Sequence, residues 1–284
     1  MPMNYLPGIN RNRMARNPEE ARVQYAEKTK VFQDKINMFL KREEMMSSAF
    51  KREEDEGTAL KRIVLVDDML NLASNYLILS KTSFAMLSLR NEEALHEARK
   101  TLYKAVMYME EVVSGFVDAP FSDYEERLRS IATVDAAQRY LLVRKLGLSV
   151  DLLQDGFGTT TKWRWAFVEL EGRSAVIAKN ILDLKKAVAN SDPRSPDYEP
   201  TVRHLELVKK LLSKTASRYR SKYELSSNQI DDFKMGIHFL EALKRFHTVF
   251  GESGEAASVK RTLDIWSAKL EGDIKKQEEM KKHQ

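Results

Sequence analysis

The sequence contains no cysteine and few of the residues that interrupt helices. The absence of cysteine excludes a disulfide framework, thiol catalysis and zinc sites built from thiolates. Only 11 glycines and 7 prolines occur among the 284 residues, so we expect few breaks and long helices. No stretch alternates β-branched and polar residues between turn signals. The sequence therefore predicts an all-α protein.

The N-terminus also lacks the apolar core of a signal peptide, because residues 1–16 carry arginines and asparagines instead. The most apolar stretch, residues 63–90, is interrupted by Asp67, Asp68 and Lys81. A membrane-spanning helix needs about 20 mostly apolar residues, and charges within it are costly. We therefore expect a cytoplasmic protein with no transmembrane segment.

Residues 63–87 carry two hydrophobic seams, both stepping by alternate intervals of three and four residues. The first seam comprises Ile63, Val66, Leu70, Ala73, Leu77, Ser80, Phe84 and Leu87. The second seam comprises Leu65, Met69, Leu72, Tyr76, Leu79, Ser83 and Met86. One seam makes a helix amphipathic, whereas two predict a helix buried against other helices on both sides.

A second long helix is predicted before this one, from the Asn17-Pro18 cap to about Gly57. Its seam comprises Tyr25, Thr29, Phe32, Ile36, Phe39, Glu43, Met46 and Phe50. The short connection between the two helices indicates a long antiparallel hairpin with coiled-coil-like seams. Residues 156–158 are predicted to form a loop, and residues 163–188, with a third seam, a single helix. The expected fold is a multi-helix bundle of about seven to nine helices, with a solenoid as the alternative.

Residues 190–200 form the linker richest in proline and serine, and we interpret them as a domain boundary. The expected organisation is a flexible basic arm at 1–17, a main bundle at 18–189, the linker, and a C-terminal three-helix unit at 201–284. The alternative is that the C-terminal unit packs on the main bundle as one domain.

Positive charge is concentrated in two segments of a chain whose net charge is +5. On a helix over residues 201–222, five cations fall within about 120° of one another. These five, which we call the basic row, are Arg203, Lys210, Lys214, Arg218 and Lys222. The N-terminal arm adds three arginines and no acid: Arg11, Arg13 and Arg16.

The basic row has three interpretations. It fits an acidic surface of a protein partner, and it also fits nucleic acid or anionic lipid, whose phosphates a row of cations neutralises. The third interpretation is a solvated face that pairs with acids of the same molecule. No recognisable nucleic-acid reading motif occurs, so a protein partner is preferred over nucleic acid.

Two tryptophans lie close together at the start of the predicted helix over 163–188. Trp163 and Trp165 point about 160° apart on a helix, so a single face cannot hold both. Trp163 belongs to the seam. Trp165 either packs against a second neighbour or is an exposed anchor for a partner.

Three motifs resemble chemical sites only superficially. Glu93 and His96 form half of a di-metal carboxylate motif, but the chain has no second Glu-x-x-His. Residues 156–162 lack the glycine and lysine spacing of a phosphate loop. Adjacent Asp67 and Asp68 diverge by about 100° and have no base or nucleophile nearby. We therefore expect no catalytic residues, no metal and no cofactor.

The sequence-based hypothesis is a non-enzymatic, cytoplasmic helical scaffold or adaptor that binds other proteins through the basic row. One alternative is a nucleic-acid-associated protein that uses the basic row and the basic arm together. Another is a self-assembling subunit, in which a second copy completes a seam at its small or polar positions: Glu43, Ser80, Ser83 and Ser174. A homo-oligomer is compatible with either hypothesis about partners.

Overall fold

The computed structural model describes residues 18–52, 57–158 and 162–282, and these ranges form an all-α bundle without strands. Ten α-helices are present there, eight of them at least seven residues long. Two short 3₁₀-helices (Phe121–Asp123 and Lys162–Arg164) and a π-helical turn (Tyr223–Ser227) join them. The helices are α1 (Pro18–Arg52), α2 (Thr58–Leu87), α3 (Glu92–Val112), α4 (Glu125–Arg129), α5 (Ala136–Phe157), α6 (Phe167–Asn180), α7 (Leu184–Ala189), α8 (Tyr198–Lys222), α9 (Ile230–Val249) and α10 (Ser253–Lys282).

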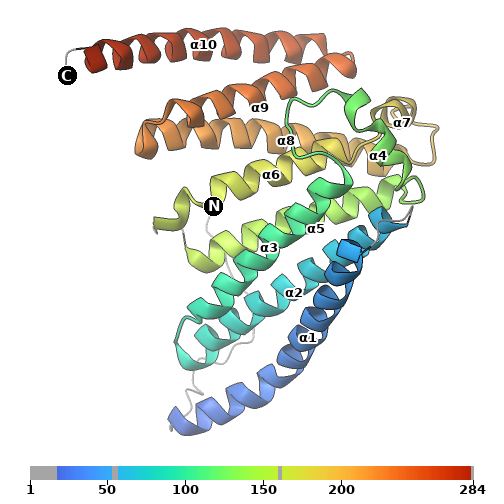
Figure 1. Ribbon diagram of the computed structural model, residues 1–284, viewed down its shortest axis with the longest axis vertical. Helices are drawn as coiled ribbons and strands as arrows, with labels where there is room; N and C mark the ends of the chain where they lie inside the picture. The colour runs from blue at the N-terminus through green and yellow to red at the C-terminus, as the bar shows by residue number, and fades with distance from the viewer. Residues whose placement is uncertain (1–17, 53–56, 159–161, 283–284) are drawn as a thin grey trace.

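The helices form an elongated stack, with α1 and α10 at its opposite ends (Figure 1). Helix α2 packs against α1, α3 and α5, while α6 joins this group to α8, and α9 lies between α8 and α10. Helix α1 packs mainly on α2, and α10 packs mainly on α9, so the two outer helices have neighbours on one side only.

The two seams predicted for α2 are both used in packing. Leu65, Met69 and Leu70 are completely buried, which confirms that helices cover α2 on opposite sides. The first seam ends before its predicted limit, because Phe84 is 65% exposed in the last turn. Ser83, one residue earlier, is buried, so at this end of α2 the second seam is covered at a level where the first is not.

The predicted N-terminal hairpin is present. Helix α1 buries Thr29, Ile36 and Phe39, all members of its predicted seam, and packs along α2. Arg42 of α1 forms a 2.9 Å ion pair with Asp68 of α2, although the two residues are far from the connection in sequence. This contact fixes the antiparallel register of the hairpin.

Three of the four small or polar seam positions have hydrogen-bond partners within the chain. Glu43 accepts hydrogen bonds from Lys104 Nζ and from Tyr108 Oη, both on α3. The hydroxyl groups of Ser83 and Ser174 donate to backbone carbonyl groups at 2.8 Å. These positions are therefore filled by one copy of the chain and give no reason to add a second copy.

Two predicted boundaries are wrong. Residues 156 and 157 are not in a loop, because α5 continues through Phe157, which is buried. Gly156 is needed for close packing rather than for a turn, since a Cβ there would lie 2.7 Å from the Leu95 side chain. Residues 163–188 are not one helix either: the chain breaks after Asn180, and the Asp183 carboxylate caps α7 by accepting from Lys186 N.

A helix that packs on the main bundle begins within the predicted linker. Helix α8 begins at Tyr198, inside the predicted 190–200 linker, and contacts both α5 and α6. The buried hydrophobic cluster runs without interruption from α1 to α10. Independent folding of residues 18–189 stays a prediction, and wholesale unfolding of a chain truncated after Asn190 would contradict it.

Candidate functional site

The basic row lies on α8, where acidic side chains of the same molecule pair with most of it. Arg203 is 2.6 Å from Glu199 one turn earlier, and Lys222 is 2.7 Å from Asp232 of α9. Lys210 is exposed and has no ionic partner within the described ranges. The row therefore presents less free charge than its sequence indicates.

Glu171 of α6 holds the middle of the basic row. Its buried carboxylate accepts from Arg218 Nε at 3.0 Å, and Lys214 Nζ lies 3.2 Å from it. Gln154 of α5 donates a further hydrogen bond, and Asp151 of α5 is 3.3 Å from Lys214. Burial opposes the charge of Lys214, but these two carboxylates outweigh it and raise its pKa. The cluster joins α5, α6 and α8.

Trp165 is half-buried against the core and lies between two guanidinium groups. Arg164 is 4.8 Å and Arg218 5.6 Å from the centre of its ring. Trp163 also packs against the core, and its ring meets that of His96 edge-on at 5.3 Å. The arm residues predicted to assist the row, Arg11, Arg13 and Arg16, lie outside the described residues.

The paired aspartates of α2 serve as structural ion-pair partners. Asp67 accepts from Lys145 of α5 at 2.5 Å, and Asp68 pairs with Arg42 of α1. Burial raises the pKa of Asp68, while Arg42 opposes this increase. In the part of the chain that the structure describes, no three His, Asp or Glu side chains are grouped so that they could hold a metal ion.

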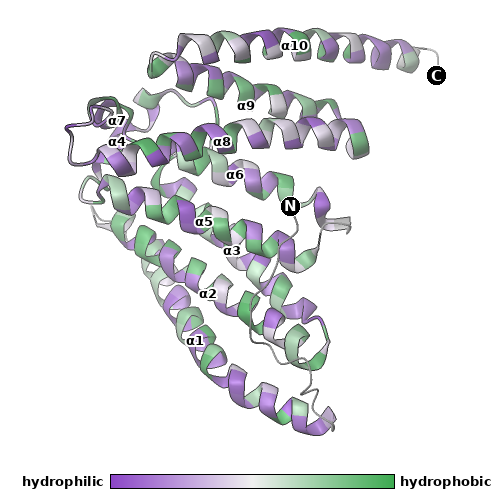
Figure 2. Cartoon of the chain, turned by 180° about the vertical axis from the view of Figure 1, so that it is seen from behind, coloured by the Kyte–Doolittle hydropathy of each residue, from purple (hydrophilic) through white to green (hydrophobic). Residues whose placement is uncertain are grey.

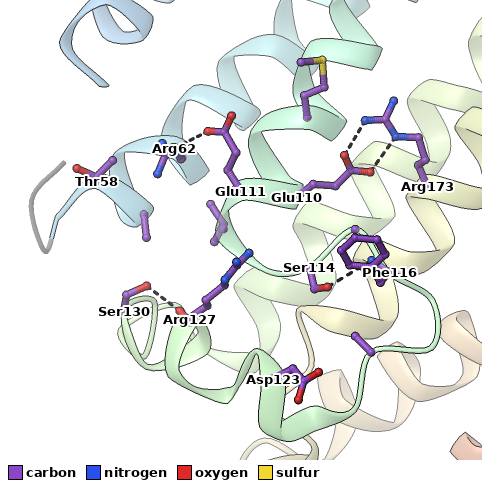
Figure 3. Close-up of a pocket in the computed structure, with 15 residues that line it drawn as sticks. Thr58, Arg62, Glu110, Glu111, Ser114, Phe116, Asp123, Arg127, Ser130 and Arg173 are labelled. Atoms are coloured by element: carbon purple, nitrogen blue, oxygen red, sulfur yellow. Dashed lines mark hydrogen bonds and ion pairs between the residues drawn. The ribbon is translucent and has the colours of Figure 1, made fainter. Parts of the chain in front are cut away.

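A cleft of about 1150 Å³ opens where the end of α3 meets the start of α2 and the α3–α4 connection (Figure 3). Arg173 makes a two-pronged ion pair with Glu110, at 2.8 and 2.6 Å, and Arg62 is 2.8 Å from Glu111. Arg127 Nη1 donates to the Val113 carbonyl at 3.0 Å. The arginines of the cleft already bind protein groups.

Another feature is a group of exposed apolar side chains on three neighbouring helices, which sequence reasoning missed. We call it the α1–α2–α5 face. Its large side chains are 38–66% exposed. They are Val31, Met38 and Met45 of α1, Val64 and Ile78 of α2, and Leu141, Leu148 and Leu152 of α5. The seven-residue spacing of Val31, Met38 and Met45 on the polar side of α1 is the signal that could have revealed it.

Contacts between the helices determine how these side chains line up along the axes of α1, α2 and α5. The Arg42–Asp68 pair aligns α1 with α2, and Lys145, which reaches both Asp67 and Asn71 at 2.5 and 2.9 Å, aligns α5 with α2. By this register, Met45, Val64 and Leu141 lie near one end of the face. Val31, Ile78 and Leu152 lie near the other end. Figure 2 shows α5, α3, α2 and α1 in succession, with hydrophobic and hydrophilic segments alternating along each helix.

Helix α2 is also the one helix in the described ranges that is long and apolar enough to cross a membrane, judged by length and composition. More than half of its most apolar window, 56%, is buried inside the protein. Its contacts with α1, α3 and α5 account for this apolar composition by core packing.

Fold and site together define an all-α protein with a central buried helix, internally paired charges and one exposed apolar face. The chain belongs to the TP0443 family, whose family model matches residues 21–274. The family's description states no activity, substrate or partner. Neither a search of curated proteins nor a search of solved structures finds a match.

Proposed function

We propose that this protein is a non-enzymatic, cytoplasmic helical scaffold that binds another protein through the α1–α2–α5 face. The observation that supports the proposal is the alignment of eight half-exposed apolar side chains on three packed helices. Soluble monomers rarely expose contiguous apolar patches larger than a few hundred Å², and larger patches mark interaction sites. Exposed apolar side chains that stand alone would need no such explanation.

The charges of α8 favour this face over the basic row as the principal binding surface. Arg218 and Lys214 are paired with Glu171 and Asp151, and Lys222 is paired with Asp232. A partner would have to displace these internal carboxylates, whereas the α1–α2–α5 face offers side chains that water alone covers. Burial of apolar surface is the dominant favourable term in most protein associations.

The test is capture of partners from native cell lysate by the full-length protein, at low and high salt and with nuclease. The variant Met38→Asp/Leu148→Asp places charges on two helices of the face. The matched control is Ile265→Asp on α10, where the original side chain is equally apolar and 69% exposed.

We expect a protein that is captured in the presence of nuclease and high salt, retained by the control and lost with the double variant. Capture that the double variant leaves unchanged would refute the proposal. Recovery of nucleic acid that salt abolishes would instead support a role for the basic row with the basic arm.

A further inference from the structure

We propose that the α1–α2–α5 face receives a single amphipathic helix of the partner, with acidic residues on both sides of its apolar stripe. This inference rests on the proposed function and specifies the chemistry of the partner. It follows from the shape of the face and from the charges that border it.

We infer that the face is a shallow trough with α2 as its floor, because α2 packs between α1 and α5. Asn75 and Asp68 of α2 are buried, and Ile78, at 38%, is less exposed than the members of the face on α1 and α5, while Val64 is 50% exposed. Packed helices lie about 8–10 Å apart, so α1 and α5 stand about 16–20 Å apart on either side of α2. A helix about 10 Å wide, lying along α2, touches the stripes on both sides.

The length of the face also matches a helix of ordinary size. Val31 and Met45 mark the ends of the stripe on α1, and Leu141 and Leu152 mark those on α5. At 1.5 Å per residue these stripes are about 21 and 17 Å long. An incoming helix of about four turns covers them, with residues spaced by three and four inserting between the stripes.

Cations without ionic partners border the trough. Lys35 and Lys28 lie one and two heptads before Arg42 on the edge of α1 that faces α2. These two lysines and Lys81 of α2 are exposed, and no carboxylate within the described ranges pairs with them. The outer edge of α5, beyond its stripe, carries both signs of charge, with Arg144 and Asp155 exposed there. The aspartates of the floor are already neutralised by Arg42 and Lys145.

The charge pattern distinguishes between occupants. Glu27 and Asp34 lie on the outer edge of α1, beyond the stripe, so the edge that faces the trough is positive. A second copy of the chain would bring its own lysines against these lysines. A partner helix with Glu or Asp beside its stripe neutralises them, and complementary charges favour that partner over others.

The test uses two synthetic peptides of about five helical turns with the same leucine stripe. One carries Glu on both sides of the stripe and the other carries Lys. Binding of each fluorescent peptide to the full-length protein is measured by anisotropy, and the contact region is mapped by hydrogen exchange.

We expect the Glu peptide to bind at least about tenfold more tightly than the Lys peptide at low salt, with a difference that shrinks as salt rises. Hydrogen exchange should slow in α1, α2 and α5. Met38→Asp/Leu148→Asp should weaken binding by at least about tenfold, whereas Ile265→Asp should leave it unchanged. Met38→Gln, a milder change, should weaken it less, and equal thermal midpoints will show that the variants are folded.

Four results would overturn the inference: no binding of the Glu peptide, equal binding of the Lys peptide, protection outside the face, or loss of binding in the control variant. Concentration-dependent association of the protein that the double variant abolishes would assign the face to a second copy. Binding to phosphatidylserine vesicles with the same dependence would assign it to a membrane. If both peptides fail while lysate capture still requires Met38 and Leu148, the helix is refuted and the scaffold proposal stands.

Discussion

A decrease of pH from 7 to 5 should destabilise the protein through one buried histidine. His204 of α8 is 1% exposed, and its Nε2 lies 2.9 Å from the Ala178 carbonyl oxygen of α6. A carbonyl only accepts, so Nε2 carries the proton and donates it. Burial lowers the pKa of His204 to about 4; the bond to Ala178 opposes this shift, and the nearby Arg139 guanidinium adds to it. The folded protein therefore holds a neutral imidazole between pH 7 and 5.

The magnitude follows from the difference between the folded and unfolded states. In the unfolded chain a histidine titrates near 6.5, so below that pH the unfolded state binds a proton that the folded state does not. Stability is therefore lost as pH falls from about 6.5, and the loss levels off near pH 4. At pH 5, about 1.5 pH units below the unfolded pKa, the cost is about 2 kcal/mol.

The assay is urea denaturation at pH 7, 6 and 5 of the original protein, His204→Gln and the control His238→Gln. A glutamine amide can still donate to the Ala178 carbonyl, but it does not titrate. Carboxylates titrate in all three proteins and cancel in the comparison. The loss between pH 7 and 5 should be smaller by about 2 kcal/mol in His204→Gln and unchanged in His238→Gln, whose side chain is largely exposed. Equal pH dependence in all three proteins would refute the reasoning.

Three further changes test the packing of the core and its buried charges, each by urea denaturation at pH 7 unless stated. Burial lowers the pKa of Lys179 to about 8, which shows that the charged amine is unfavourable in the folded protein. At pH 7 this amine is charged, so Lys179→Met should raise the free energy of unfolding by about 2 kcal/mol. That gain should vanish above pH 11, where the amine is neutral in both states, and a loss at pH 7 would contradict the argument. Gly172→Ala brings a Cβ to 3.1 and 3.2 Å from two aromatic rings and should lower the free energy of unfolding by about 1–3 kcal/mol. As its control, Gly272→Ala places a Cβ in open space and should raise that free energy by up to about 1 kcal/mol. Glu171→Gln keeps the shape but removes the charge that holds two cations, so it should cost about 2 kcal/mol, and an unchanged midpoint would show that the cluster contributes nothing.

Periodicity predicted which faces of the helices are buried better than it predicted where burial stops and where helices end. The two seams of α2 and the seam of α1 were correct because three- and four-residue spacing directly reports which face of a helix leaves water. The prediction that Phe84 is buried was wrong because the spacing along one helix does not show whether a neighbouring helix covers a given position. Gly156 was misread as a break because a glycine that allows close packing and a glycine that ends a helix look the same in one sequence.

The candidate site was predicted less well than the fold. The basic row lies on α8, where Arg203, Lys210 and Lys214 are exposed but Arg218 and Lys222 are half-buried. Its acidic partners come from α5, α6 and α9 as well as from α8 itself. A single sequence shows only the partners within the same helix, such as Glu199 for Arg203. The α1–α2–α5 face was missed because its members belong to three segments far apart in the chain.

The sequence by itself determined that the chain is helical, that α2 is central and that α1 and α2 form a hairpin. Those properties depend on propensity and on periodicity within one segment. Only the tertiary structure decided which charges are neutralised and which apolar side chains stay in water. Both outcomes depend on the register between helices, since contacts such as Arg42–Asp68 and Lys145–Asp67 bring distant segments to within a few ångströms of each other.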